Sequence, residues 1–307
     1  MSNKWWEKNL CILCKMPAIS VIVPTRLRHR LLIRALNSLH NQSFKDFEII
    51  VIDDNPPEAR LEKFPELANL LSEKNTRVVT DENPKNAARA RNLGLKNASG
   101  EWISYLDDDD AYREQKLEKQ IEMAKNTNLP IGFCGLAYHL GLRIRYKHID
   151  RTEFKNDELL LDIQTIATLF HKNCGEVFFN EDLNAGEDAY MFFSLVKYFN
   201  IFRVFNVAEP LMDIYPQTGP RVNTNPEGVY KAMNLTINDY GNLFSESARQ
   251  TYKYRADLAY FKLCKGHWLD MFNAGKNLLR LRGKSELRLV LNAFFYKSPF
   301  IRRFFVG

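Results

Sequence analysis

The sequence predicts an α/β protein with a mostly parallel sheet and helices on both faces. Short apolar runs at residues 19–23, 48–52 and 102–106 lack the polar alternation of half-exposed strands, which is typical of strands buried on both faces. Segments with apolar residues at helical spacing separate these runs. This β-α alternation favours parallel strands joined by helices that cross the sheet.

The expected elements follow one another from residue 19 to residue 126. Strand 19–23 ends at Pro24, and strand 48–52 runs into the turn residues 53–57. The helix expected between these strands, 30–42, carries four apolar residues at helical spacing: Leu32, Ala35, Leu36 and Leu39. The remaining elements are helix 61–71, strand 77–80, helix 86–98, strand 102–106 and helix 112–126.

Past residue 126 the pattern is less regular. We expect strands at 131–138 and 142–146 and a helix at 159–170, and then three amphipathic helices at 228–244, 247–264 and 267–282. These changes in character divide the chain into four parts. They are an N-terminal extension at 1–17, an α/β domain at 18–226, a helical segment at 227–283 and a basic aromatic tail at 284–307.

Size and cysteine content bound the class of protein. A chain of 307 residues that is 45% hydrophobic can bury one large core and carry an appendage. Five cysteines form no disulfide framework, and the lone Cys11–Cys14 pair is interpreted as reduced and structural, with a redox role as the weaker alternative. We see no signal peptide and no apolar stretch long enough to span a membrane, so a soluble cytoplasmic protein is expected.

The net charge of +6 is concentrated at the C-terminus. Residues 276–307 hold eight Lys or Arg and one acid, Glu286, so the rest of the chain sums to −1. This argues against a nucleic-acid-binding core. Basic residues beside aromatic ones in the tail predict contact with an anionic membrane surface, at the inner face of the cell membrane. The alternative is that the aromatic side chains pack onto the helices at 228–282.

Four consecutive aspartates, Asp107 to Asp110, follow the strand at 102–106. Carboxylates packed this tightly repel one another unless water or a cation neutralises them. A solvated acidic turn is the ordinary interpretation of such a run. Here, however, the run lies at the carboxyl end of a strand, where open α/β sheets bind ligands. Hard carboxylate oxygens suit Mg²⁺ or Mn²⁺, so the position favours a metal site.

Five segments carry motifs in a fixed order: Ser20–Thr25, Asn41–Asp54, Ala90–Gly94, Ala98–Asp110 and Gly186–Asp188. In order and spacing they resemble the family 2 glycosyltransferases of the GT-A fold. The resemblance covers roughly residues 19–225. Each motif alone is a weak signal, but five in register are specific.

The resemblance implies a nucleotide-sugar donor, usually a uridine or thymidine diphosphate sugar, and a divalent metal, Mn²⁺ or Mg²⁺. Asp107 or Asp108 would contact the donor ribose, and Asp109 would ligate the metal. The chemistry agrees, because displacing a nucleoside diphosphate requires its charge to be neutralised and a base to take the acceptor proton.

The resemblance also implies further donor contacts. Asp53 matches the carboxylate that pairs with the pyrimidine base, with a turn or capping role as the alternative. Pro24 and Thr25 match the loop whose backbone touches the base. Arg91 matches a donor-binding arginine, although a lone helical arginine is usually just solvated, and Arg28 is expected to reach the donor as well.

Glu187 and Asp188 precede the apolar helical run 189–195, so this acid pair is expected at a helix N-terminus. From the residues alone, a catalytic role and simple complementation of the helix dipole, worth under about 1 kcal/mol, stay equally open. The resemblance favours Asp188 as general base and Glu187 as its orienting neighbour. Base-assisted displacement from the opposite face implies inversion at the anomeric carbon.

The chain departs from the family pattern at several positions. Arg26 and Leu27 stand where a tyrosine and an asparagine are usual, although a guanidinium can also stack on a base. Pro216 and Thr218 stand where many relatives carry an arginine and a metal-ligating histidine. Phosphate binding is therefore expected to rely more on the aspartates. No Gln-x-x-Arg-Trp pattern is present, which argues against a processive synthase.

We therefore expect a metal-dependent, inverting, non-processive glycosyltransferase. It would move a hexose or N-acetylhexosamine to a glycan or lipid-linked acceptor of a bacterial surface glycan. One alternative is a noncatalytic nucleotide-sugar or glycan-binding module, for which the changes at Arg26 and Leu27 leave room and against which Asp109 and Asp188 argue. Another is a response-regulator-like phosphoacceptor, which would need about half this length and leaves Gly186–Asp188 unexplained.

Overall fold

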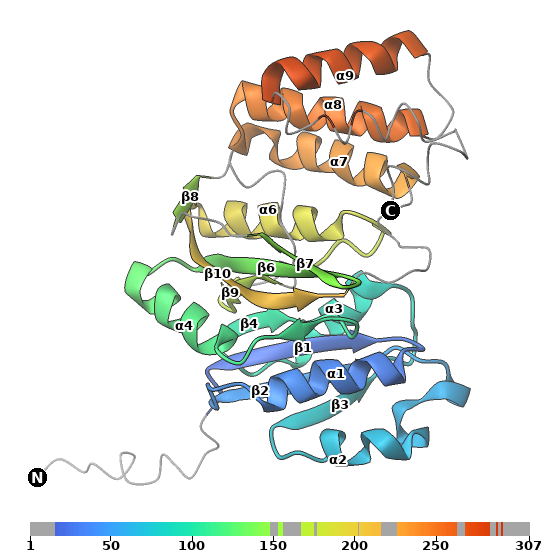
Figure 1. Ribbon diagram of the computed structural model, residues 1–307, viewed down its shortest axis with the longest axis vertical. Coiled ribbons are helices and arrows are strands. Elements are labelled where there is room, and N and C mark those ends of the chain that lie inside the picture. The colour runs from blue at the N-terminus through green and yellow to red at the C-terminus, as the bar shows by residue number, and fades with distance from the viewer. Residues whose placement is uncertain are drawn as a thin grey trace, which may run out of the picture.

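A ten-stranded sheet forms the centre of the molecule, in the strand order β3-β2-β1-β4-β9-β6-β10-β5, with β7 paired to β6 and β8 to β10 (Figure 1). The computed structural model describes residues 16–147, 153–155, 167–174, 177–201, 203–215, 226–262, 268–282, 287 and 290. The strands are β1 Ile19–Thr25, β2 Phe47–Asp53, β3 Thr76–Thr80, β4 Trp102–Tyr105, β5 Ala111–Tyr112, β6 Ile131–Leu140, β7 Arg143–Lys147, β8 Glu153–Lys155, β9 Leu169–His171 and β10 Arg203–Ile214.

The first half of the sheet is parallel, as predicted. β1 pairs in parallel with β2 and β4, and β2 with β3. Val21 of β1 belongs to the core on one face, with α1 (His29–His40) and α4 (Lys116–Thr127), and its neighbour Ile22 belongs to the core on the other face, with α3 (Ala87–Asn97) and α6 (Glu187–Phe199). Burial on both faces explains why the strand has no polar alternation.

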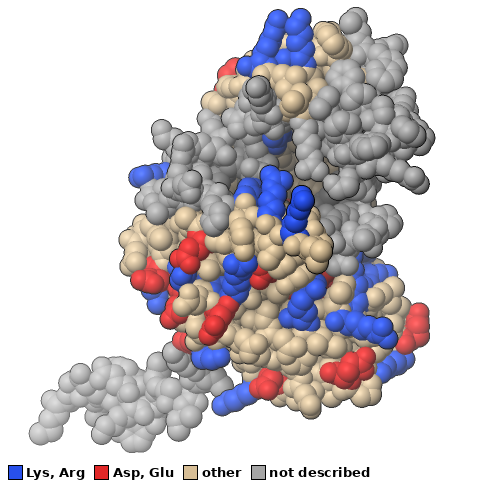
Figure 2. Space-filling view, viewed as in Figure 1, with Lys and Arg blue, Asp and Glu red and all other residues tan. Residues whose placement is uncertain are grey.

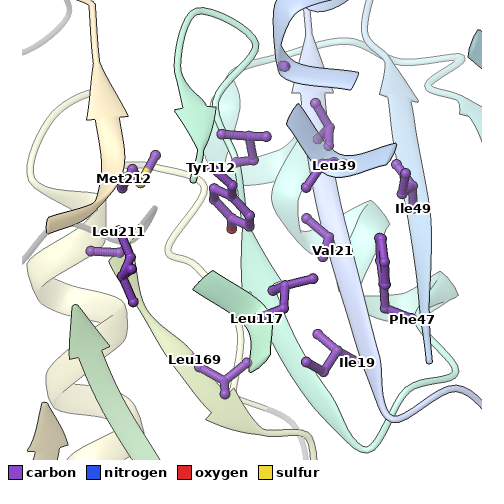
Figure 3. Packing of buried hydrophobic residues seen from close by; sticks show 14 of the residues in the cluster. Ile19, Val21, Leu39, Phe47, Ile49, Tyr112, Leu117, Leu169, Leu211 and Met212 are labelled. Carbon is purple, nitrogen blue, oxygen red and sulfur yellow. The ribbon is translucent and has the colours of Figure 1, made fainter. Parts of the chain in front are cut away.

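The first of these cores packs apolar side chains from strands and helices that are distant in sequence. Figure 3 draws 14 of its members and labels ten of them: Ile19, Val21, Leu39, Phe47, Ile49, Tyr112, Leu117, Leu169, Leu211 and Met212. Because they come from both halves of the sheet, this core joins the parallel strands to β9 and β10.

The second half of the sheet contains the antiparallel pairs. β9 is antiparallel to both β4 and β6, whereas β10 is parallel to β6 and antiparallel to β5 and β8. The predicted helix at 159–170 is wrong at its end, because Leu169 and Phe170 lie in β9. Leu169 faces one core and Phe170 the other, an arrangement that suits a strand. The rest of that prediction, residues 159–166, lies outside the described residues.

Two further predictions need correction. The helix expected at 112–126 begins only at Lys116, because Ala111 and Tyr112 pair with β10 as β5, and the Tyr112 hydroxyl donates to the Tyr105 carbonyl at 2.6 Å. The helix expected at 61–71 is a series of 3₁₀ turns followed by the short α2. These elements are η1 Pro57–Ala59, η2 Leu61–Lys63, η3 Pro65–Leu67 and α2 Ala68–Leu71. Pro65 breaks a continuous helix because it has no backbone N–H.

The three C-terminal helices lie in successive layers beyond α6 (Figure 1). They are α7 Pro226–Tyr240, α8 Glu246–Lys262 and α9 Trp268–Arg282, with the 3₁₀ turn η6 Gly241–Leu243 between the first two. Two hydroxyl contacts join α6 to α7: Ser194 Oγ lies 2.7 Å from Tyr240 Oη, and Tyr190 donates to Asp239 at 2.7 Å. None of the described helices combines the length and apolar character needed to cross a bilayer.

The ends of the chain fall largely outside the described residues, and Cys11 and Cys14 with them. Of the basic tail, Leu287 is exposed and Val290 is buried against a small apolar cluster of α8 and α9. The membrane contact predicted for the tail therefore stays a prediction.

Lys116 of α4 is fully buried among polar groups beside the sheet. Its Nζ donates to Gln120 Oε1 at 2.7 Å and to Ser104 Oγ at 3.3 Å, and lies 3.8 Å from the ring centre of Tyr112. Within the described part of the chain it has no carboxylate partner. Burial lowers the pKa of Lys116 to about 8.

Lys116 should therefore make the free energy of unfolding depend on pH in the alkaline range. Between pH 8 and the ordinary lysine value of 10.5, the unfolded chain binds more protons than the folded one, so stability rises with pH. The rise should reach about 3 kcal/mol, and Lys116→Met should remove it. Urea denaturation across this range checks the prediction, with Lys125→Met, an exposed site on the same helix, as the control. Parallel curves for wild type and Lys116→Met would contradict it.

Candidate active site

The loops that follow β1, β2 and β4 meet at one edge of the sheet, because these strands are parallel. The hydroxyl of Thr25 donates to Asp108 Oδ2 at 2.7 Å. Arg28 donates to Asp108 Oδ1 at 3.3 Å and to Asp109 Oδ2 at 3.2 Å. Four of the predicted site residues are thus in direct contact. Asp53 lies opposite Thr25 in the β1–β2 register, which places it at the same edge.

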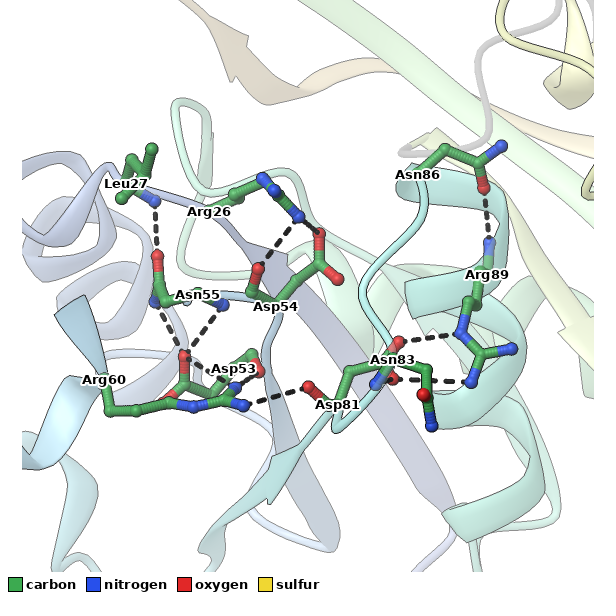
Figure 4. A network of polar contacts seen from close by, with 10 residues as sticks. All are labelled: Arg26, Leu27, Asp53, Asp54, Asn55, Arg60, Asp81, Asn83, Asn86 and Arg89. Atoms are coloured by element: carbon green, nitrogen blue, oxygen red, sulfur yellow. Dashed lines mark hydrogen bonds and ion pairs between the residues drawn. The ribbon is translucent and has the colours of Figure 1, made fainter. Parts of the chain in front are cut away.

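The loop after β1 is shaped by Leu27, whose backbone adopts φ +56°. A left-handed conformation is unfavourable for leucine, and the amide of Leu27 is held there by donating to Asn55 Oδ1 at 2.5 Å (Figure 4). The two flanking arginines contact different strands. Arg26 donates to Asp54 Oδ2 at 3.1 Å, beyond β2, whereas Arg28 contacts the aspartates beyond β4. Arg26 and Leu27, which depart from the family pattern, therefore connect this loop to Asp54 and Asn55 at the end of β2.

Asp53 is engaged by its own loop. Its Oδ1 accepts from the backbone and side-chain nitrogens of Asn55 at 3.2 and 2.7 Å, and its Oδ2 accepts from the amide of Leu61 at 2.9 Å. Arg60 bridges the carbonyl oxygens of Asp53 and Asp81 at 2.8 and 3.1 Å (Figure 4). These contacts are those of a turn aspartate, and the base contact implied by the resemblance stays a prediction.

The four consecutive aspartates divide into two groups. One carboxylate oxygen each of Asp107, Asp109 and Asp110 lies within 4.8 Å of the others, whereas Asp108 is not part of this cluster and accepts from Thr25. Burial, together with repulsion from Asp107, raises the pKa of Asp110 to about 8. Burial also raises the pKa of Asp108 to about 6, although its bond from Thr25 acts in the opposite direction. Three hard oxygen donors at this separation fit Mg²⁺ or Mn²⁺, and such an ion would relieve the repulsion.

Arg34 of α1 is a site residue that the sequence did not reveal. Its guanidinium donates to the carbonyl of Asp109 and lies 3.7 Å from the ring centre of Tyr215. The amide of Tyr215 donates to Asp110 Oδ1 at 2.9 Å, and its ring stacks on His139. A single arginine within a helix carries no pattern that would distinguish it from a solvated one. The next residues, including Pro216 and Thr218, lie outside the described range.

Arg91 of α3 joins the aspartate run to the start of α6. Its guanidinium lies 2.9 Å from Asp107 Oδ1, 3.2 Å from Glu187 Oε1 and 3.6 Å from Asp188 Oδ1. The side chain is only 6% exposed. Burial alone would lower the pKa of Arg91, but the three carboxylates more than offset this and raise it above its ordinary value. The guanidinium is engaged by protein carboxylates, and its predicted donor contact stays a prediction.

Neighbouring contacts fix the position of α3. The side chain of Asn86 caps the helix by accepting from the amide of Arg89 at 3.0 Å. Asn92 exchanges two hydrogen bonds with the backbone of Phe179, at 3.0 and 2.8 Å. These bonds anchor α3 against the segment that precedes α6, so Arg91 reaches both carboxylate groups from a rigid helix.

The acid pair lies in the first turn of α6, as predicted. Gly186 precedes it at φ +73°, and a Cβ at that position would lie 2.8 Å from Ala232 of α7. Burial and the neighbouring Asp188 raise the pKa of Glu187. Asp188 Oδ1 is buried and has no hydrogen-bond partner, although the side chain as a whole is 32% exposed. Its other oxygen is therefore the one that a ligand can reach.

The sequence matches the family described as Glycosyl transferase family 2 over residues 20–183, more than half of the chain. The chain belongs to glycosyl transferase family 2. The names of several bacterial relatives state an activity, among them two glucosyltransferases. A Campylobacter jejuni protein named GalNAc(5)-diNAcBac-PP-undecaprenol beta-1,3-glucosyltransferase is 30% identical over 207 residues, 62% of this chain and 66% of that protein. The Escherichia coli UDP-Glc:alpha-D-GlcNAc-diphosphoundecaprenol beta-1,3-glucosyltransferase WfgD is 33% identical over 111 residues, 36% of this chain and 42% of that protein.

A solved structure supports the fold of this family 2 chain. Staphylococcus aureus TarS 1-349 in complex with UDP-GlcNAc superimposes with a TM-score of 0.64 at 20% identity, covering 90% of this chain and 79% of that one. The predicted GT-A fold is thereby confirmed. The chain spans 34% and 50% of the length of two further relatives, uncharacterized glycosyltransferases of Rickettsia conorii and Haemophilus influenzae.

Arg91→Met should destabilise the protein because it leaves Glu187 and two other carboxylates without their cation. We expect the free energy of unfolding to fall by about 3 kcal/mol, the low end for breaking a buried ion pair, since Asp107 and Asp188 are one-third exposed. Urea denaturation measures the loss. The control is Arg249→Met, which breaks an exposed pair with Glu246 and should cost under about 1 kcal/mol. Equal losses of unfolding free energy in the two variants would show that the Arg91 contacts stabilise the fold no more than an exposed ion pair does.

Proposed function

We propose that this chain is a metal-dependent, inverting glycosyltransferase that moves a sugar from a UDP-sugar to a glycan or lipid-linked acceptor in bacterial surface-glycan synthesis. One observation carries the proposal: a cluster of metal-type carboxylates and a carboxylate with an accessible oxygen, Asp188, share one buried arginine. The parts needed to hold a charged leaving group and to take a proton therefore lie side by side.

The relatives support the choice of substrates. The names of the Campylobacter and Escherichia proteins describe transfer of glucose onto sugars linked through diphosphate to undecaprenol. The TarS structure was determined with UDP-GlcNAc. A UDP-sugar donor and a lipid-linked acceptor are accordingly proposed for this chain. Such an acceptor would place the protein at the inner face of the membrane, where the basic tail would contact anionic lipid.

The donor would bind at the edge of the sheet where β1, β2 and β4 end. Pro24, Thr25 and Asp53 would face its base, Asp107 or Asp108 its ribose, and Arg28 its diphosphate. Asp109 would hold Mn²⁺ or Mg²⁺ together with Asp107 and Asp110, whose oxygens lie within reach. When bound, the ion neutralises charge on the departing diphosphate.

The proton transfer is assigned to Asp188. Its accessible oxygen would take the proton from the acceptor hydroxyl while the hydroxyl oxygen of the acceptor attacks the anomeric carbon. The bond from that carbon to the diphosphate breaks in the same step, so that UDP leaves with the electron pair. Attack from the face opposite the leaving group inverts the anomeric configuration. Arg91 and Glu187 orient Asp188 from its buried side.

The first test is UDP release from UDP-glucose, UDP-galactose and UDP-N-acetylglucosamine, with Mn²⁺ and with EDTA. A water-soluble, short-chain diphosphate-linked sugar serves as acceptor. Release that needs Mn²⁺ supports the proposal. Binding of UDP in calorimetry without release from any donor would favour the noncatalytic nucleotide-sugar-binding module instead.

Asp109→Asn should weaken metal binding by about 10²-fold, the scale for changes around a metal site, and abolish metal-dependent donor binding. The fold should persist because Asn has nearly the same shape as Asp and the Asp109 side chain is only partly buried. Mn²⁺ binding followed by electron paramagnetic resonance measures the effect. Asp182→Asn, at a carboxylate that is 78% exposed, is the matched control. Near wild-type Mn²⁺ affinity in Asp109→Asn would remove Asp109 from the metal site.

Asp188→Asn should leave UDP-sugar binding unchanged yet slow transfer by about 10²–10⁴-fold, the usual contribution of general-base catalysis. Calorimetry with UDP and steady-state kinetics separate the two effects. A loss of UDP affinity as large as the loss of rate would instead place Asp188 in the donor site.

A further inference from the structure

The end of the β6–β7 hairpin, residues 138–147 (the arm), extends past the last pair between β6 and β10, Tyr138 with Ile214. Leu140 pairs with Arg143, so only Gly141 and Leu142 form the turn. Gly141 has φ +65°, as a type II′ turn requires at its first central position, and a Cβ built there would meet no atom within 4 Å. The tip is thus open on the side toward which a Gly141 side chain would point, and Leu142 beside it is fully exposed.

Apolar and basic side chains alternate along this arm, and nearly all are exposed. Leu142 is fully exposed, and Leu140, Ile144 and Tyr146 are 51%, 45% and 47% exposed. Residues two apart on a strand face the same side, so Ile144 and Tyr146 share one face of β7. Leu140 pairs with Arg143 and therefore lies on the other face, and Leu142 lies in the turn. Four large apolar side chains exposed within one short hairpin are unusual for a soluble surface and indicate a site of interaction.

All the charged side chains of the arm are basic. Residues 138–147 include Arg143, Arg145 and Lys147 and contain no Asp or Glu. The guanidinium groups of Arg143 and Arg145 are exposed, and within the described ranges neither forms an ion pair. Figure 2 shows basic side chains gathered over the middle of the face on which Figure 1 draws β6 and β7. The surface that this arm fits is therefore both anionic and apolar.

The base of the arm is connected to the candidate active site. His139, which pairs with Ile144 of the arm, lies 2.8 Å from Asp213 of β10 and stacks on Tyr215. Tyr215 in turn donates to Asp110. β6 also runs in the same direction as β4, since both are antiparallel to β9, so the arm extends beyond the edge where the aspartates lie.

We propose that the β6–β7 hairpin is a membrane-docking arm that binds the phosphate headgroups of an anionic bilayer through Arg143 and Arg145 while Leu142 enters the interface. Basic and apolar residues combine in this way at membrane surfaces, and each basic side chain strengthens binding to an anionic leaflet. Its purpose rests on the proposed function: the arm would hold the aspartates facing the bilayer, where a lipid-linked acceptor presents its sugar. Binding itself can be measured without any activity.

The test is flotation of the full-length chain with vesicles of phosphatidylcholine alone and of phosphatidylcholine with phosphatidylglycerol, at low and high salt. Wild type should bind only the anionic vesicles. Arg143→Glu with Arg145→Glu should weaken that binding by at least about tenfold. These glutamates keep the exposed edge strand charged, so protection against edge-to-edge pairing is retained. The matched control is Lys74→Glu with Lys125→Glu, the same charge change at two exposed lysines elsewhere, which should bind like wild type.

A second variant tests the apolar contribution. Leu142→Ser should weaken binding to anionic vesicles without altering net charge. Equal binding by wild type and the arginine variant would overturn the proposal and leave the C-terminal tail as the membrane contact. Equal loss in the lysine control would also overturn it, because general charge would then be responsible. UDP release with the soluble acceptor should be the same in all variants. If wild type releases no UDP, that result contradicts the proposed function and leaves the membrane-docking proposal unaffected.

Discussion

The candidate site depends on one buried guanidinium. Arg91 contacts Asp107 beyond β4 and both acids at the start of α6, three groups that would repel one another without it. An uncompensated buried charge is destabilising, so the arginine and its carboxylates stabilise one another's positions. The proposed metal ligands and the proposed base are thereby held in one geometry before any substrate arrives.

The mixed sheet explains how these groups meet. Its parallel half brings the ends of β1, β2 and β4 to one edge, which positions the loops at Thr25, Asp53 and Asp107. The antiparallel β9 then joins this half to β6 and β10, and α6 packs on the shared core. The same connection sends the β6–β7 arm past that edge. Catalysis and membrane contact, as proposed, therefore use the two halves of one sheet.

The predictable parts were those encoded by local pattern. Strand 48–52 and the helix at 86–98 were recognisable because burial and periodicity are local signals, and the aspartate run and acid pair were found where expected. β5 and β9 were missed because each is a few residues long and forms only through pairing with distant strands. Arg34 was missed for a related reason: its partners, Asp109 and Tyr215, lie far along the chain. The loop contacts of Asp53 likewise depend on backbone geometry that residue identity does not specify.

The measurement that most directly tests the role of Arg91 is a double-mutant cycle between Arg91→Met and Glu187→Gln, read as the free energy of unfolding in urea. If the guanidinium holds the acid pair in place, losing it should cost less once Glu187 is neutral, with a coupling energy of about 1–3 kcal/mol. If the double variant loses the sum of the two single-variant losses to within about 0.5 kcal/mol, the result contradicts this account. Arg91 and the acid pair would then be independent.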